Sequence, residues 1–322
     1  MRLADERWGY TTGLHDIGSG AYAWLAPDGS WGWSNAGLIT DGDESLVVDT
    51  LFDLALTSEM LAAMRDAEPV ATATIDRLVN THANGDHCHG NELVAAHEII
   101  ASTTSAAEMS ELPPEALAAL MDAFATGEST LARYLRSCFA SFDFHGISLT
   151  LPTRTFEQHL EITVGDKTVG LYEVGPAHTG GDVIVHCPSD GTVFTGDILF
   201  IEGSPIMWAG PVQNWLDACD LIVDLDADVI VPGHGPITDE RGVTAVREYL
   251  GYVRDEARTR YEAGMSVVDA ARDIDLGHFG TWTDTERIVA NVAGLYREFG
   301  SRERFDTVEL FQAMAEYAEN VS

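Results

Sequence analysis

Basic residues are scarce in this chain of 322 residues. It has 18 Lys and Arg against 52 Asp and Glu, and Lys167 is its only lysine, so the formal net charge is −34. An acidic surface repels the phosphates of nucleic acids and the headgroups of anionic membranes. We therefore expect neither nucleic acid nor membrane among its partners, and a small molecule as its substrate.

Paired cysteines and long apolar runs are also absent. The four cysteines, Cys88, Cys138, Cys187 and Cys219, form no CxxC motif. No apolar run approaches the roughly 20 residues of a membrane helix, and residues 1–7 contain no apolar signal-peptide core. We expect a cytoplasmic protein without disulfides, in which the cysteines are small buried residues. Only Cys88, inside the motif described below, invites a second role.

Apolar residues make up 45% of the chain, enough for a sizeable core, and their spacing predicts alternating strands and helices. The expected strands are 36–39, 45–49, 77–80, 98–101, 160–164, 168–174, 183–187, 192–195 and 228–231. The expected helices between them are 54–67, 90–96 and 212–223. This alternation indicates an α/β protein.

Two stretches break the alternation. Residues 102–150 have helical apolar spacing and a Pro113-Pro114 pair that can open a helix, so they predict a helical insertion. From about Gly242 onward the chain predicts helices only, and Thr283-x-x-Glu286 and Asp306-x-x-Glu309 both match capping boxes. These C-terminal helices fit a dimer interface, a lid or packing on the chain's own core.

One short segment concentrates metal-binding side chains directly after a predicted strand. Residues 81–87 place His82, Asn84, Asp86 and His87 within six positions. A loop at a strand end can turn several side chains toward one point, and Gly85 allows a tight bend there. Imidazole and carboxylate together suit zinc, iron or manganese. A lone histidine is more often a structural core residue, so this segment alone is only moderately specific.

Three further residues occupy glycine-rich turns after later predicted strands. They are His178 within 175–182, Asp197 within 194–197 and His234 within 232–236. Four strand-end loops can converge on one edge of a sheet. Their combination therefore predicts a metal centre built from both halves of the chain.

The ordered set resembles the metallo-β-lactamase superfamily, whose pattern is HxHxDH, then a His, then an Asp or Cys, then a His. The resemblance covers about residues 35–240, and Asp49 resembles the family's early strand-end Asp, which supports the site loop. It implies a four-layer αββα sandwich with the metals at one edge of two sheets. We expect a catalytic domain over 1–240, with the helical insertion at about 102–150, and a helical C-terminal extension over 241–322.

The resemblance also implies two metal positions. The first would take His82, the residue at position 84 and His178, and the second would take Asp86, His87 and His234, with Asp197 bridging the two. Zinc, as one or two ions, is the implied cofactor, with iron or manganese as alternatives. Asp86 is the implied catalytic residue, placed to orient a water or move its proton.

Position 84 departs from the pattern, because it holds Asn where the family usually has His. An amide oxygen is a much weaker zinc ligand than an imidazole. A weakly bound first metal, a single metal at the second position, and a hydrogen-bonding role for Asn84 are the three open interpretations. We favour two sites of unequal affinity. His89 lies two residues past His87 and is expected to point away.

The residues around Asp197 bear on the reaction. An Asp rather than a Cys at this position resembles the thioester hydrolases and lactonases of the superfamily. Phe200, Met207 and Trp208 lie nearby, and we expect them to line a substrate pocket, although such clusters are more commonly core. We expect a metallo-hydrolase that cleaves an ester, lactone or thioester bond with metal-activated water. A mononuclear iron dioxygenase of the same superfamily and a non-catalytic metal-binding module are the alternatives.

Overall fold

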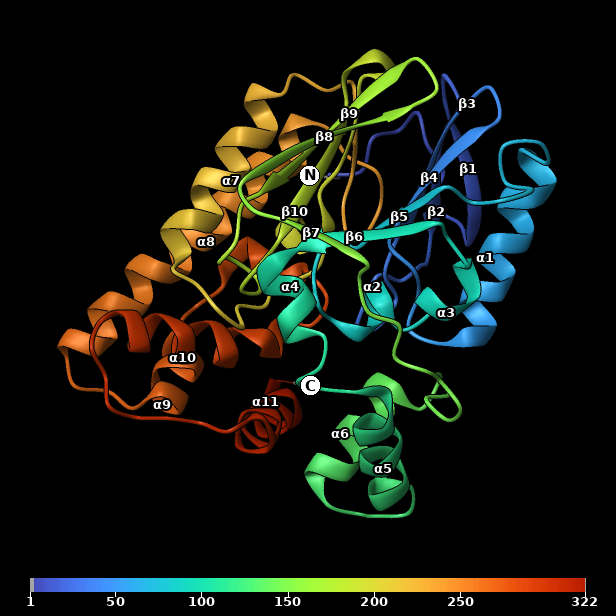
Figure 1. Cartoon of the computed structure of the whole chain (residues 1–322). Helices are drawn as coiled ribbons and strands as arrows, with labels where there is room; N and C mark the ends of the chain where they lie inside the picture. Colours follow the sequence, from blue (N-terminus) through green and yellow to red (C-terminus); the bar gives the residue numbers. More distant parts are fainter. Residues whose placement is uncertain (1–2, 322) are drawn as a thin grey trace.

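The computed structural model describes residues 3–321 and shows two β-sheets packed face to face between layers of helices (Figure 1). The first sheet has the order β1-β2-β3-β4-β5-β6-β7. Its strands are Gly13–Gly18, Ala21–Leu25, Ala36–Asp41, Glu44–Val48, Arg77–Val79, Glu98–Ser102 and Arg154–Phe156. The second sheet has the order β12-β11-β10-β9-β8. In chain order, β8 to β12 are His159–Val164, Lys167–Glu173, Val183–Cys187, Thr192–Phe194 and Val229–Val231. The predicted αββα sandwich is confirmed.

Apolar side chains fill the space between the sheets and beneath each helical layer. Val48 of the first sheet and Val185 and Phe194 of the second belong to the core between the sheets. The outer face of the first sheet packs against α1 (Leu54–Ala67), whose apolar spacing predicted these bounds, and near it lies α3 (Asn91–Val94). The outer face of the second sheet is covered by α7 (Val212–Asp224) and α8 (Glu240–Glu262), and α10 (Ile288–Glu298) packs against α8.

Parallel strand pairs bring the polar loops to one edge of the sandwich. Strands β4, β5 and β6 are parallel neighbours in the first sheet, and β11 and β12 are parallel neighbours in the second. The carboxyl ends of parallel strands lie at the same edge of a sheet. The loops after β5, β11 and β12 therefore share an edge, as the sequence predicted. The hairpin of β1 and β2 and the edge strand β7 were not predicted.

The predicted helical insertion is present as three helices, α4 (Thr103–Glu108), α5 (Pro114–Phe124) and α6 (Thr130–Phe139). Helices α5 and α6 lie outside the sandwich, beside the C-terminal helix α11 (Thr307–Val321) (Figure 1). Leu131, Leu135 and Phe139 of α6 form an apolar cluster against which Phe311 of α11 packs. Two segments far apart in sequence therefore meet at this end of the molecule.

The C-terminal part is helical, as predicted, and contains α8, α9 (Val267–Asp273), α10 and α11. One of its two predicted capping boxes is confirmed, because Asp306 and Glu309 each accept a hydrogen bond from the other's backbone N–H, at 2.9 Å. The other prediction was wrong. Glu286 accepts hydrogen bonds from Trp31 and Tyr134, and α10 begins only at Ile288. Across residues 3–321, no helix combines the length and the apolar character needed to cross a membrane.

Candidate metal centre

The structure brings the predicted ligands together from four loops of the chain. His82 follows β5, and Asp86 and His87 lie in the short helix α2 (Gly85–Cys88). His178 follows β9, and Asp197 lies in a one-turn 3₁₀ helix, Gly196–Ile198, after β11. His234 follows β12. Every one of these loops lies at the sheet edge described above, so the tertiary fold assembles the set that the sequence only suggested.

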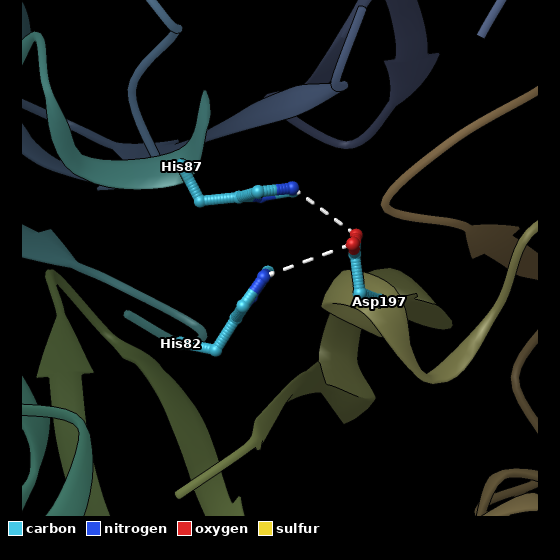
Figure 2. A group of neighbouring side chains, drawn as sticks. All are labelled: His82, His87 and Asp197. Atoms are coloured by element: carbon cyan, nitrogen blue, oxygen red, sulfur yellow. Dashed lines mark ion pairs between the residues drawn. The ribbon is translucent and has the colours of Figure 1, made fainter. Parts of the chain in front are cut away.

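Asp197 is the centre of the group. Its Oδ1 is 3.1 Å from His87 Nε2, and its Oδ2 is 3.3 Å from His178 Nε2, 3.5 Å from His234 Nε2 and 3.7 Å from His82 Nε2. Figure 2 shows His82 and His87 directing their rings at this carboxylate from one side. One carboxylate thus faces four imidazoles, as expected for a bridging ligand.

Asp86 approaches two of the imidazoles. Its Oδ2 is 3.3 Å from His234 Nε2 and 3.9 Å from His87 Nε2. Two compact sets of possible metal ligands result, His82 with His87 and Asp197, and Asp86 with His87 and His234. Within each set the donor atoms lie within 4.8 Å of one another. A metal–ligand distance of about 2.0–2.2 Å for zinc is compatible with such spacing.

Unpartnered buried atoms show that these residues fit a metal ion. His82 Nε2, His87 Nε2 and Asp197 Oδ1 are all buried, and none has a hydrogen-bond partner among the described residues. Buried polar atoms are almost always partnered, because leaving one unpaired costs about 1–3 kcal/mol. The three atoms belong to one of the compact sets, so a single ion would satisfy all of them.

The hydrogen-bond partner of Nδ1 orients each imidazole so that Nε2 faces the centre. His87 Nδ1 lies 2.9 Å from Asp49 Oδ2, His178 Nδ1 lies 2.7 Å from the Ile206 carbonyl, and His234 Nδ1 lies 3.1 Å from the Gly29 carbonyl. These oxygens only accept, so each Nδ1 carries the proton. In the neutral state each ring therefore presents a lone pair at Nε2.

His82 reaches the same state through Thr81. The Thr81 hydroxyl donates its single hydrogen to Asp49 Oδ2, at 2.7 Å, and so accepts from His82 Nδ1, at 3.0 Å. Asp49 also accepts from the Thr81 backbone N–H at 2.7 Å. It has a φ of +62°, a strained conformation for a non-glycine residue. Asp49 thus orients two ligands without facing the centre, which agrees with the supporting role that the resemblance implied.

Charges inside the group shift the acidities of its members. Burial lowers the pKa of His87, but the carboxylates of Asp197, Asp86 and Asp49 outweigh it and raise that pKa well above its usual value. Burial also lowers the pKa of His234, but the carboxylates of Asp197 and Asp86 outweigh burial and raise that pKa to about 9. Burial raises the pKa of Asp86, but His87 and His234 outweigh burial and lower that pKa to about 2. Asp86 is therefore a carboxylate at neutral pH.

Asn84 lies against His178 at the edge of the group. Its side-chain oxygen lies 2.8 Å from His178 Nε2, and although Asn84 is the N-cap residue of α2, its side chain does not cap the helix. His178 already donates from Nδ1, and burial lowers its pKa, so the neutral ring can only accept at Nε2. The Asn84 amide therefore lies against the nitrogen that a first metal would need.

Cys88, the last residue of α2, and His89, its C-cap residue, face away from the ligands. The His89 ring contacts Phe52 and Phe144, at centroid distances of 5.7 and 6.4 Å, as expected for a residue that points away. Burial lowers its pKa to about 4. Cys88 is buried, and its thiol lies 3.6 Å from the Ala83 carbonyl.

Residues that brace the His234 loop were missed by sequence reasoning. Asn35 donates from its side chain to the carbonyls of Pro232 and Gly235, at 3.0 and 2.8 Å. A Cβ at position 233 would collide with the Asp197 carboxylate, so only glycine fits there. Asn35 follows no motif of its own, and it lies about 200 residues away along the chain.

The centre opens into a cavity of about 420 Å³. Phe200 and Trp208 line it, as predicted, and Phe200 stacks on His234 with ring centroids 5.0 Å apart. The prediction for Met207 was wrong, because its sulfur packs toward Gly294 and Gly210 and it does not line the cavity. The insertion and α11 supply much of the remaining wall, which the sequence did not indicate for α11.

Comparison with known proteins agrees with this geometry. Residues 29–234 match the sequence profile described as "Metallo-beta-lactamase superfamily". The chain is also similar to a Caenorhabditis elegans protein named "Beta-lactamase-like protein 2 homolog", with 30% identity over 90 residues. That match covers 28% of this chain and 29% of the worm protein.

Solved structures share the fold at low sequence identity. The sec-alkylsulfatase Pisa1 from Pseudomonas sp. has a TM-score of 0.70 and 14% identity, over 91% of this chain and 51% of that chain. A metallo-beta-lactamase from Pontibacter korlensis has a TM-score of 0.54 and 17% identity, over 75% of this chain and 99% of that chain. The chain spans about half the length of the sulfatase.

Proposed function

Because this chain belongs to the metallo-β-lactamase superfamily, we propose that it is a metal-dependent hydrolase that cleaves an ester, lactone or thioester bond of a small molecule. One observation carries the proposal. Four imidazoles, each with Nδ1 held by an acceptor, direct Nε2 at the carboxylate of Asp197, and this group lines an apolar cavity. Such a set is suited to a divalent metal, and we propose zinc.

The proposed roles follow from position and charge. The members of the two compact sets, His82, Asp86, His87, His234 and Asp197, would hold the metal, whose Lewis acidity would polarise the scissile carbonyl and acidify a water. Asp86 borders the cavity and is ionised at neutral pH, so it can accept a proton from the attacking water or orient it. Asp49 keeps His87 and, through Thr81, His82 in the tautomer that the site requires.

The charges around the cavity favour an uncharged scissile group. Among the described residues that line it, Arg287 is the only arginine or lysine, and its Nη2 pairs with Asp284 Oδ2 at 2.9 Å. Its Nη1 donates to the Ser204 carbonyl at 3.0 Å. With its cation already compensated, the cavity offers no free charge for an anionic substrate group, whereas a carbonyl ester needs none.

The test is hydrolysis by the full chain after zinc loading. We expect turnover of p-nitrophenyl acetate, of an acyl thioester or of a γ-lactone that disappears on chelation and returns with zinc. Asp86→Asn keeps the shape of the side chain, and we expect it to lose turnover even when it is loaded with zinc. Zinc-loaded Asp86→Asn protein with unchanged kcat would overturn the role of Asp86. Zinc-loaded wild-type protein inactive on all three bond types would overturn the proposal.

A second candidate function rests on the composition of the ligand sets. Each compact set contains two histidines and one carboxylate, the combination used by non-haem iron oxygenases. Metal analysis of protein purified without added metal separates the two candidates. Iron together with substrate-dependent oxygen uptake would favour the dioxygenase, and zinc without oxygen uptake would favour the hydrolase.

A further inference from the structure

The cavity has a polar end and an apolar end. Asp86, Asp197 and His234 form the polar end at the sheet edge. The walls away from the metal centre come from α5 and α6, through the side chains of Leu117, Leu120, Phe124, Leu131 and Leu135. A group bound at the metal centre can therefore extend, inside one continuous space, between helices that the sandwich core does not need.

An aromatic wall lines the path between the two ends. It consists of Trp31, Phe139, Trp208 and Phe311, which come from four separate segments. The Trp31 ring lies 5.4 Å from Phe311, 5.9 Å from Phe139 and 6.3 Å from Trp208, measured between centroids. Aromatic rings at such distances stabilise one another. This wall is therefore a packed surface, and not a set of loose side chains.

Buried polar contacts hold the wall from behind. Trp31 Nε1 donates to Glu286 Oε1 at 3.1 Å, and the Tyr134 hydroxyl donates to the same oxygen at 2.7 Å. The guanidinium of Arg287 lies 4.4 Å from the centre of the Trp31 ring. These contacts satisfy the polar atoms of the wall, so the face toward the cavity is left apolar.

Apolar side chains also line the cavity where it meets solvent. Leu112 and Val308 line it, and each is 53% exposed. They are two of the five large hydrophobic side chains that are exposed among the described residues. Glu108 and Glu111 lie beside them, so an anionic chain end would be repelled there. A neutral apolar chain matches both the mouth and the interior.

We propose that the substrate carries an unbranched aliphatic chain, which lies between α5, α6 and α11 while its ester or thioester carbonyl lies at the metal centre. The inference rests on the proposed hydrolase function and deepens it by naming the substrate class. The volume of about 420 Å³ is within the range of small-molecule sites, roughly 300–1,000 Å³. A short acyl group would leave the apolar end unfilled.

The chain length of the substrate is the variable to test. With zinc-loaded full-length protein and p-nitrophenyl esters from acetate to laurate, we expect kcat/KM to rise about fourfold per added methylene, as burial of about 0.8 kcal/mol per CH₂ requires. The rise should appear mainly in KM and should stop once the cavity is full. A flat profile with measurable acetate hydrolysis would overturn the aliphatic-chain proposal and leave the hydrolase proposal intact.

A substitution in the wall places the chain. Leu120 of α5 is only partly buried and lines the cavity, so Leu120→Trp should fold and should shorten the preferred chain. Leu151→Trp is the matched control, because Leu151 is 42% exposed and does not line the cavity. The proposal requires the optimum to shift in the first variant and to stay in the second. An unchanged optimum in Leu120→Trp would contradict it.

Binding gives an answer even if no ester is hydrolysed. Displacement of the neutral dye Nile red by 1-alkanols from butanol to decanol reports on the cavity without chemistry. We expect affinity to rise with chain length in the wild type and in Leu151→Trp, and to level off at a shorter chain in Leu120→Trp. Displacement that is independent of chain length, or equal in the two variants, would overturn the proposal.

Discussion

The two sides of the metal centre hold their ligands differently. On the His87 side, formed by Asp86, His87 and His234, His87 is bound to the carboxylate of Asp49 and its Nε2 faces Asp197. On the Asn84 side, formed by His82, Asn84 and His178, an amide lies against His178 Nε2. Asp197 faces both sides.

The difference teaches that proximity alone does not make a ligand. His178 Nε2 is as close to Asp197 Oδ2 as the equivalent atom of His234, yet the Asn84 amide also lies 2.8 Å from it. A metal on the Asn84 side must displace the amide. It then has one imidazole ligand fewer than the family pattern provides. We therefore expect unequal affinities on the two sides, with the tighter ion bound by the His87 side and Asp197.

Loss of Asp197 should weaken metal binding on both sides at once, because both sides share this carboxylate. For Asp197→Asn we expect both sides to lose metal. Loss of a residue that only supports a ligand costs up to about hundredfold, and we expect turnover to fall by well over that. Metal content and kcat/KM are the measurements. Asp220→Asn, an exposed residue paired with Arg247, is the control and should keep both. Retention of two ions by Asp197→Asn would refute the shared role.

Asp49→Asn should weaken the His87 side. The substitution removes the charge-assisted hydrogen bond to His87 Nδ1, and such outer partners contribute about 10- to 100-fold in metal affinity or activity. Calorimetric titration with zinc measures the change. Asp76→Asn, which lies just before β5 and contacts no ligand, should bind zinc as the wild type does. Equal affinities in the two variants would show that His87 needs no partner.

Asp182 provides a pH test of the Asn84 side, because it anchors the loop that carries His178. It accepts hydrogen bonds from the backbone N–H and the hydroxyl of Thr179, and burial, outweighing these bonds, raises its pKa to about 7. A carboxyl with a raised folded-state pKa stabilises the fold fully below its unfolded pKa of about 4, and this contribution is lost as the pH rises through 7.

Between pH 5.5 and 8.5 we expect the wild type to lose about 2 kcal/mol of unfolding free energy through this group. Asp182→Asn has no charge to bury, so it should lack this part of the pH dependence. Urea unfolding of both metal-free proteins across this pH range measures it. Parallel stability curves for the two proteins would rule out a buried, neutral Asp182.

Asn84→His should remove the inequality between the sides. The variant adds an imidazole and releases His178 Nε2, so we expect zinc on the Asn84 side to bind about tenfold more tightly or better. Metal content per chain and the absorption spectrum of the cobalt form report it without an activity assay. Asn84→Ala releases His178 without adding a ligand, and so separates the two effects. Unchanged stoichiometry and affinity in Asn84→His would show that position 84 does not limit binding.

The two capping-box patterns show how far local sequence reaches. Asp306 and Glu309 form the predicted reciprocal bonds, because both residues are exposed and nothing else competes for them. Glu286 matches the same pattern but is only 8% exposed, and its carboxylate accepts hydrogen bonds from Trp31 and Tyr134 instead. Those partners are 255 and 152 residues away, so no local pattern could reveal them.

The bounds of α1, the order of the metal ligands and the departure at Asn84 were determined by sequence alone, because apolar period and motif spacing are local properties of the chain. The tertiary structure alone decided the contact between Asn84 and His178, the bracing of the His234 loop by Asn35, and the apolar cavity shared by α5, α6 and α11. Each of these joins segments far apart in the chain. Their proximity depends on how two sheets and their helices pack, which no single segment encodes.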